Sequence, residues 1–129
     1  MENCPCGSLK NYATCCEIFI TGKKPAPTPE ALMRSRYTAY TKANIDYIKR
    51  TMQGPALKGF DELHAKQWAS EVTWLGLRVK HSSEKNNRGW VEFFARYAMN
   101  HEGHEIHELS EFERINEQWY YTNRLEKSE

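Results

Sequence analysis

All four cysteines of this 129-residue chain lie within its first sixteen residues. Two stand one residue apart and, after a spacer of eight residues, two stand side by side; they are Cys4, Cys6, Cys15 and Cys16. The spacer begins with Gly7 and Ser8, which are good turn formers and let the chain fold back on itself. The spacing therefore predicts that four thiols meet at one point near the N-terminus.

Three kinds of chemistry use thiols grouped in this way. Disulfide bonds are typical of exported chains, but this N-terminus lacks the basic start and apolar stretch of a signal peptide. A bond between Cys15 and Cys16 would also close a strained ring. A redox site more typically has a Cys-x-x-Cys pattern, whereas four thiolates match a closed tetrahedral zinc site. The pattern therefore favours structural zinc, with no open position for water, in a reducing cytoplasm.

The composition restricts the partners that the whole chain can have. The formal charge is +1, from 18 basic and 17 acidic residues, which gives no electrostatic basis for coating nucleic acid or an acidic membrane. No apolar run approaches the ~20 residues that a membrane helix needs. Hydrophobic residues make up 40% of the chain, enough to fill one core. We expect one domain with a small appendage and neither nucleic-acid nor membrane partners.

The cysteine-rich segment is similar to a known zinc module. The stretch CPCGS, a spacer containing Tyr12 and the closing pair CC resemble the SEC-C motif, which occurs in the tail of the translocase ATPase SecA and in many bacterial proteins. The resemblance implies a zinc ion on the four cysteines and a knuckle that docks a protein partner. Leu9 stands where the motif usually has glycine, and Lys10 is the only lysine in the spacer. The motif and its linker are expected to span residues 1–24.

Helical signals follow the linker. Thr28, followed by a proline and a glutamate, predicts the N-cap of a helix over residues 30–43. Asn44 is expected to cap a second, short helix that ends at Gly54-Pro55. Asp61 is expected to open a third helix.

From about residue 71 the hydrophobic period changes from that of a helix to the period of two that is typical of strands. Connections near 82–89 and 99–104, and a tight turn at Asn116-Glu117, fit antiparallel pairing. The order predicts an α+β fold, in which about three helices cover one face of a curved four-stranded antiparallel sheet. Expected strand residues are Leu75, Leu77 and Val79; Val91, Phe93, Ala95 and Tyr97 on one face; and Trp90, Glu92, Phe94 and Arg96 on the other.

Four blocks of this region resemble a bacterial family. They are LMRSRYTAY at 32–40, FFARY at 93–97, HELSEF at 107–112 and QWYYTN at 118–123. They look like the YchJ family, which joins a SEC-C motif to a domain of the nuclear transport factor 2-like fold. The resemblance implies that residues 25–129 form a cone of helices on a curved sheet, but it implies no reaction.

Arg36 falls in the middle of the apolar stripe of the first predicted helix, a costly placement unless a carboxylate meets it. Glu108 is the first candidate partner and Glu92 the second. Such a pair either fixes the helix to the sheet or belongs to a pocket in which Arg36 or Arg96 holds an anionic group. The candidate pocket residues are Arg36, Tyr37, Tyr40, Trp90, Glu92, Phe94, Arg96, His107, Glu108 and Trp119, with Trp68 as a further aromatic.

The stretch HEGHEIH at 101–107 resembles a metal motif only superficially, because the zinc-protease pattern needs histidines four apart on a helix. We expect these histidines in a solvated loop. Two functions then remain. The first is a cytosolic zinc protein that binds a protein partner through the knuckle or a small molecule in the cone. The alternative is a small isomerase or lyase that uses a polar cavity around Arg36, His107 and Glu108.

Overall fold

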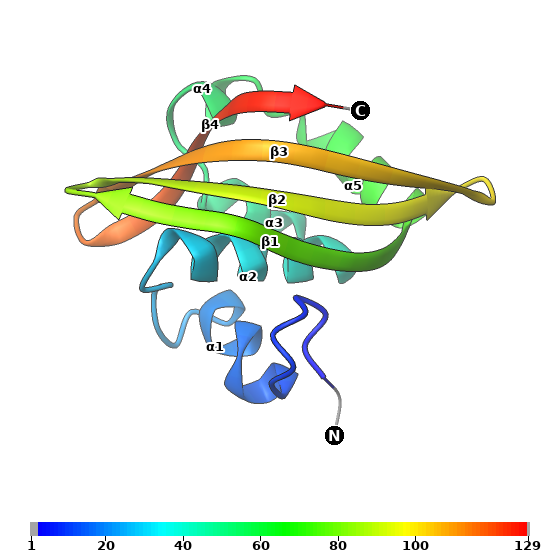
Figure 1. Cartoon of the computed structure of the whole chain (residues 1–129), viewed down its shortest axis with the longest axis horizontal. Helices are drawn as coiled ribbons and strands as arrows, with labels where there is room; N and C mark the ends of the chain where they lie inside the picture. The colour runs from blue at the N-terminus through cyan, green and yellow to red at the C-terminus, as the bar shows by residue number, and fades with distance from the viewer. Residues whose placement is uncertain (1–2, 129) are drawn as a thin grey trace.

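The computed structural model describes residues 3–128, with the side chains of residues 3–125. Helices lie on one face of a curved antiparallel sheet whose strand order is β1-β2-β3-β4 (Figure 1). The strands are β1 (Thr73–Lys85), β2 (Arg88–Met99), β3 (Glu102–Ile115) and β4 (Gln118–Ser128). The predicted α+β class and the four-stranded antiparallel sheet are confirmed.

The helical elements precede the sheet in sequence. In residues 3–128 they are the 3-10 turn η1 (Tyr12–Thr14), α1 (Cys16–Ile20), α2 (Pro29–Thr41), α3 (Ile45–Arg50), α4 (Gly54–Lys58) and α5 (Glu62–Glu71). We call residues 3–20, which carry the cysteines, η1 and α1, the leader. Figure 1 shows the leader beside α2, at the opposite end of the molecule from the C-terminal end of β4.

Three helix starts follow from local capping, as predicted. The side chains of Thr28, Asn44 and Asp61 each accept the backbone N–H three residues further on, at 3.0, 3.1 and 3.0 Å. The expected end at Gly54-Pro55 is wrong, because these residues begin α4 and α3 already stops at Arg50. Proline fits the first turn of a helix, where its missing N–H has no partner to lose. The domain thus has one helix more than the three expected.

The strands are longer than predicted because the connections between them are short. Residues 86–87 join β1 to β2, and residues 100–101 join β2 to β3, so most of the expected loops at 82–89 and 99–104 belong to strands. Asn86 and Asn100 adopt φ of 58° and 53°, a left-handed conformation that asparagine tolerates better than most residues. The tight turn at Asn116-Glu117 is confirmed, with φ of 51° and 66°.

A bulge changes the face assignment at the start of β1. The pairing register of β1 with β2 shifts between Trp74 and Gly76, so Leu75 is the extra residue. Leu75 is 54% exposed, whereas the sequence pattern placed it with Leu77 and Val79. That expectation is wrong because one inserted residue reverses the alternation of side chains. Trp74 instead packs against the core.

The leader shares the core of the domain. Cys4, Cys6 and Cys16 are 4%, 0% and 1% exposed, and they belong to the same cluster of buried residues as Ile48 and Phe112. The leader is therefore packed on the domain over much of its surface rather than projecting from it as a separate knob.

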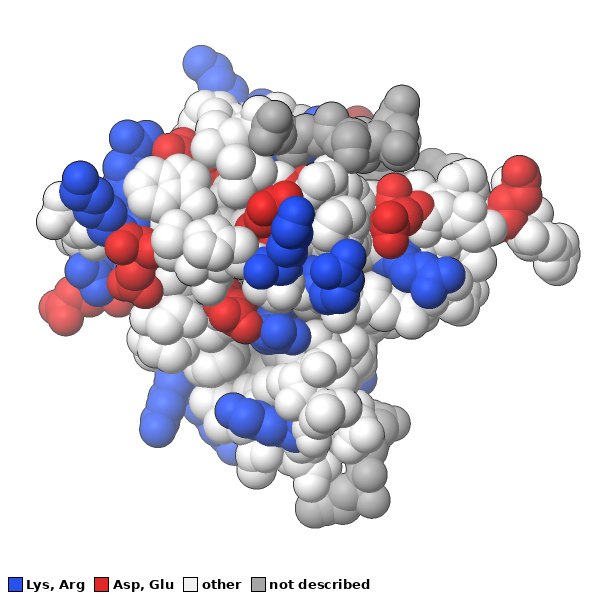
Figure 2. All heavy atoms as spheres, in the orientation of Figure 1, with Lys and Arg blue, Asp and Glu red and all other residues white. Residues whose placement is uncertain are grey.

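On the face shown in Figure 2, basic and acidic side chains lie next to one another over the sheet. Nζ of Lys80 lies 3.8 Å from Oε2 of Glu92, and Nη2 of Arg88 lies 2.7 Å from Oε2 of Glu111. This face therefore presents no uniform basic surface. Among the described residues, no helix has the length and apolarity required to cross a membrane.

Candidate metal centre and cavity

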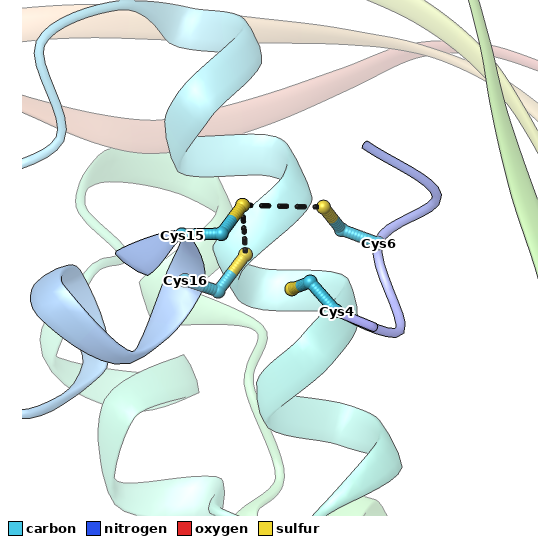
Figure 3. Close-up of side chains that lie close together, drawn as sticks. All are labelled: Cys4, Cys6, Cys15 and Cys16. Carbon is cyan, nitrogen blue, oxygen red and sulfur yellow. Dashed lines mark hydrogen bonds between the residues drawn. The ribbon is translucent and has the colours of Figure 1, made fainter. Parts of the chain in front are cut away.

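The four cysteine sulfurs meet in one cluster at the joint between the leader and α2 (Figure 3). All four are free thiols, and their sulfurs lie within 4.8 Å of one another. The sulfurs of Cys6 and Cys15 are 3.8 Å apart, and those of Cys15 and Cys16 are 4.0 Å apart. A tetrahedral ion with Zn–S bonds of about 2.3 Å sets its ligands about 3.8 Å apart. The donor set and its spacing therefore fit a zinc ion.

The backbone of the leader makes this convergence possible. The N–H of Cys4 donates to the carbonyl of Lys10 at 2.8 Å, which closes the loop between the two cysteine pairs. Gly7 has φ of +82°, and a Cβ at this position would lie 3.1 Å from the carbonyl oxygen of Leu77 in β1. Glycine therefore lets the loop turn and approach the sheet closely. Leu9 adopts φ of +69° in the same loop, at the position where glycine is usual in the motif.

The thiols are not equivalent electrostatically. The pKa of Cys6 is lowered to about 4 because the thiol of Cys16 stabilises its thiolate, while the same contact and burial raise the pKa of Cys16. Burial also raises the pKa of Cys15, whose sulfur lies 3.2 Å from the hydroxyl of Ser8. The cluster thus favours one thiolate, and a divalent cation is what would allow all four thiols to ionise together.

Polar contacts connect the cysteine cluster to the helices. Arg34 of α2 donates through Nη1 to the carbonyl of Cys6 at 2.6 Å and through Nε to Glu30 at 2.9 Å. The sulfur of Cys4 lies 3.7 Å from the hydroxyl of Thr38. At the other end of the leader, Arg50 donates to the carbonyl of Ile20 at 2.6 Å. The cysteine cluster therefore lies at the contact between the leader and α2.

The helix that contacts the cysteines also lines a cavity of about 250 Å³ between the helices and the inner face of the sheet. Arg36, Tyr37 and Tyr40 contribute to it from α2. A wider groove of about 1020 Å³ lies next to it and shares six wall residues with it, namely Tyr40, Trp68, Ile106, Glu108, Tyr121 and Arg124. Further members of the cavity wall are Trp74, Phe93, Glu108, Ser110, Tyr121 and Arg124.

Arg36 does not form the ion pair that the sequence suggested. Its Nη1 donates to the carbonyl of Ile48 at 2.8 Å and to the hydroxyl of Thr51 at 2.7 Å. The guanidinium carbon lies 4.7 Å from the ring centre of Tyr121. Among residues 3–125, no carboxylate lies within 4.0 Å of the Arg36 guanidinium. The expected direct pair with Glu108 is therefore wrong, because backbone and hydroxyl oxygens of α3 and its C-cap meet the cation instead.

Glu108 faces the same cavity but has other partners. One of its oxygens, Oε2, accepts the hydroxyl of Tyr121 at 3.1 Å and also the hydroxyl of Ser110. Burial raises the pKa of Tyr121, of Tyr40 and, to about 12, of Tyr37. These phenols therefore stay protonated near neutral pH and act as hydrogen-bond donors. Tyr121 lies between the Arg36 cation and the Glu108 carboxylate.

The structure separates the predicted pocket residues into two groups. Arg36, Tyr37, Tyr40 and Glu108 line the cavity, as does Trp68. The residues of β2 that alternate with its buried positions point to the outer face; they are Trp90, Glu92, Phe94 and Arg96. His107 stacks on Phe94 at 4.2 Å and so shares that outer face. Trp119 is buried at another edge of the core, near Gly89. The first five of these six do not line the cavity, because successive strand residues point to opposite faces. Trp119 does not line it because its ring packs elsewhere in the core.

The histidines lie in a strand and not in a loop, which corrects the expectation for two of them. His104 and His107 belong to β3, on opposite faces, with His104 stacked 5.1 Å from Tyr97. His107 Nε2 lies 2.7 Å from the carboxylate of Glu92. In the alternative function, an enzyme would use Arg36, Glu108 and His107 in one cavity. His107 does not reach that cavity, because neighbouring residues of a strand face opposite sides.

Comparison with known proteins assigns the family. The family model described as the YchJ middle NTF2-like domain matches residues 28–124, and the SEC-C motif matches residues 2–18. The chain belongs to the YchJ family. A UPF0225 protein of Geobacter sulfurreducens is 42% identical over 123 residues, which cover 93% of this chain and 76% of the relative.

Two solved structures resemble this YchJ-family chain over most of its length. The solution structure of a SEC-C motif-containing protein from Rhodopseudomonas palustris has a TM-score of 0.89 at 40% identity and covers 96% of this chain and 98% of its own. The crystal structure of a SEC-C motif-containing protein from Psychrobacter arcticus has a TM-score of 0.84 at 28% identity and covers 95% and 81%. Both the fold and the N-terminal motif expected from the resemblance are therefore confirmed.

Sequence reasoning missed several residues of this YchJ-family site. Arg34, which holds the leader, appears on the helical wheel as an ordinary polar-face residue. Tyr121 and Arg124 line the cavity from β4, and Trp74 enters it because of the bulge in β1. The alternation of β4 could have identified Tyr121, because it lies two residues after the buried Trp119.

Proposed function

We propose that this chain is a zinc-stabilised binding protein of the bacterial cytosol, whose cone cavity takes a small ligand. The observation that carries the proposal is the double role of α2. One side of this helix contacts the cysteine cluster through Arg34 and Thr38, and the other side supplies Arg36, Tyr37 and Tyr40 to the cavity. A metal ion on the cysteines would therefore fix the helix that shapes the binding site.

The metal has a structural role in this proposal. Four thiolates complete a tetrahedral coordination sphere, so no position remains for a substrate or a water. The residues that would hold the ion are Cys4, Cys6, Cys15 and Cys16, of which three are buried. The ion would neutralise part of the thiolate charge and link the two ends of the leader.

The cavity supports binding more than proton transfer. Aromatic walls with a few polar groups are typical of small-molecule sites. Glu108 faces the cavity, and its Oε2 already accepts hydrogen bonds from two hydroxyl groups, those of Ser110 and Tyr121. We therefore assign Glu108 to orienting a ligand.

The leader also supports a protein partner as a second role. Leu9 is 83% exposed at the turn of the leader, where a large apolar side chain gains nothing from packing within the chain. A partner protein would contact the leader at this exposed apolar side chain.

The metal part of the proposal is tested on the purified full-length chain by elemental analysis and equilibrium unfolding. We expect one zinc per chain, and removal of zinc with a chelator should lower the unfolding midpoint. The double variant Cys4→Ser, Cys6→Ser should bind no zinc. Ser8→Ala, which changes a neighbour of Cys15 and keeps all four thiols, is the control and should retain the metal. A chain that holds no stoichiometric metal when prepared with zinc would contradict the proposal.

The ligand part is tested by a thermal-shift screen of small metabolites on the metal-loaded chain. Glu108→Gln and Glu92→Gln are a matched pair, because one carboxylate lines the cavity and the other lies on the outer face of the sheet. A ligand of the cavity should respond to the first substitution and not to the second. Hits that respond equally to both, or to neither, would place binding elsewhere and remove the cavity from the proposal.

A further inference from the structure

The cavity contains a buried cation without a counter-ion. Arg36 is 7% exposed, and one of its three guanidinium nitrogens, Nη1, makes both of its hydrogen bonds, to Ile48 and Thr51. Across residues 3–125, no acidic side chain pairs with it. A buried charge that lacks an opposite charge is costly in a folded protein. The structure therefore keeps a charge in the core that nothing in the described chain neutralises directly.

The other nitrogens of Arg36 are open to the cavity. In the described part of the chain, two fully buried side-chain nitrogens lack a hydrogen-bond partner. They are the indole Nε1 atoms of Trp74 and Trp119. Nε and Nη2 of Arg36 have no hydrogen-bond partner there either, so both keep some exposed surface, and the cavity that Arg36 lines is a space that can provide it. These two nitrogens form one edge of the guanidinium fork, the arrangement that binds both oxygens of a carboxylate.

The nearest acidic candidate is kept away from this edge. Tyr121 places its ring 4.7 Å from the Arg36 guanidinium carbon and donates its hydroxyl to Glu108 at 3.1 Å. The charged side chains that line the cavity in the described chain are Arg36, Arg124 and Glu108, which sum to one positive charge. The cavity is thus electrostatically suited to an anion more than to a cation.

The shape of the cavity restricts the body of such an anion. Its volume of about 250 Å³ lies below the range of about 300–1,000 Å³ that is typical of sites for drug-sized ligands. Tyr40, Trp68 and Trp74 form an aromatic cluster at the wall, with ring centres 5.3–6.1 Å apart; Trp68 meets the other two edge to face, and Tyr40 and Trp74 are tilted. Aromatic walls of this kind pack best against a flat apolar group.

We propose that the cavity binds a small planar carboxylate, about one ring in size, with its carboxylate on the free edge of Arg36. The ring lies against the aromatic wall, and Glu108 at the far side accepts a hydrogen bond from a donor on the ligand. This assignment rests on the proposed ligand-binding function and names the chemical class of the ligand.

The test uses three probes with the same ring and different charge, namely benzoate, benzamide and benzylammonium. Each is titrated into the full-length, zinc-loaded chain and followed by NMR chemical shifts of the backbone amides. We expect benzoate to bind at least about tenfold more tightly than benzamide, because only the carboxylate gains charge-assisted bonds to Arg36. Benzylammonium should bind least. The shifted amides should lie in α2 and on the inner face of β2 and β3.

Three variants identify the residues responsible. Arg36→Lys keeps the charge but loses the fork, and should weaken benzoate by about tenfold while leaving benzamide unchanged. Because this change also removes the bonds to Ile48 and Thr51, a second variant is needed that leaves Arg36 in place. Glu108→Gln removes a negative charge from the cavity and should tighten benzoate severalfold. Glu92→Gln, on the outer face, should change nothing.

The assignment is overturned if benzylammonium binds more tightly than benzoate, or if Glu108→Gln weakens benzoate. The first result identifies a cation site, and the second shows that Glu108 supports the anion and does not repel it. Both leave the proposed ligand-binding function standing. The absence of a shift with all three probes at millimolar concentration also overturns the planar-carboxylate assignment. The metabolite screen then decides separately whether the cavity binds any ligand.

Discussion

The joint between the leader and α2 can be tested by replacing Arg34 with methionine, which keeps an unbranched apolar stem and removes the guanidinium group with its charge. Arg34 donates to the carbonyl of Cys6 at 2.6 Å and to Glu30 at 2.9 Å, with 22% of its side chain exposed. A hydrogen bond from a charged donor contributes about 1.5–3 kcal/mol, and an exposed ion pair one helical turn apart about 0.3–0.5 kcal/mol. We expect Arg34→Met to lower the free energy of unfolding by about 2–3 kcal/mol.

The measurement is urea unfolding of the zinc-loaded chain, followed by tryptophan fluorescence, together with competition for zinc by a chromophoric chelator. Arg34→Met should lower the urea midpoint at an unchanged slope. It should also weaken zinc binding, because part of the lost energy comes from the docked, metal-competent form of the leader. These two effects are expected together because the contact lies at a metal-ligand residue.

Arg88→Met is the matched control. Arg88 lies 2.7 Å from Glu111 but is 58% exposed, so its loss should cost at most about 1 kcal/mol and leave zinc affinity unchanged. If Arg34→Met destabilised the chain no more than Arg88→Met, or if zinc affinity did not change, the reasoning that the metal centre is held to α2 through Arg34 would be refuted.

Three further outcomes are expected. Leu9→Gly should raise the free energy of unfolding by about 1 kcal/mol in the same urea assay, because Leu9 has a left-handed φ of +69° and is 83% exposed; lower stability would contradict this. Gly89→Ala should lower the free energy of unfolding by about 1–3 kcal/mol, because a Cβ there would lie 2.2 Å from the ring of Pro29, which begins α2. Gly103→Ala, where a Cβ meets nothing within 4 Å, is its control and should be near neutral. The contact with His107 lowers the pKa of Glu92 below its usual 4.5, so the stability that the carboxylate contributes is present above that pH and is lost as the pH falls through the lowered value. The difference between the unfolding midpoints of Glu92→Gln and the unchanged chain should therefore be constant well above pH 4.5 and shrink as the pH falls below that value. A difference that stays the same over the whole acidic range would argue against the pair.

Local signals in the sequence determined much of the fold. The capping side chains Thr28, Asn44 and Asp61 mark the starts of three helices, because a cap needs only a side-chain oxygen and the N–H three residues on. The alternation in β2 correctly separates its buried face from its outer face, because the period of two is a property of the extended backbone. The grouping of the four cysteines likewise follows from their short spacing.

Alternation alone could not tell which face of the sheet the helices cover, and the candidate pocket therefore mixed both faces. Glu108 and His107 are neighbours in β3, yet one lies in the cavity and the other pairs with Glu92 on the outer face. Leu75 shows a related limit. A single bulge reverses the alternation of buried and exposed side chains, and nothing in the composition of the strand indicates where the bulge lies.

Only the tertiary structure decided how the charged residues of α2 are used. The wheel placed Arg36 on the buried face and Arg34 on the polar face, but it could not show that Arg36 binds the carbonyl of Ile48 and not Glu108, or that Arg34 reaches the carbonyl of Cys6. Backbone carbonyls are present at every residue and carry no sequence signature, so a contact to one depends on how distant segments pack. For the same reason, the sequence could not show that the cysteine cluster and the cavity are linked. The structure shows it, because both contact α2.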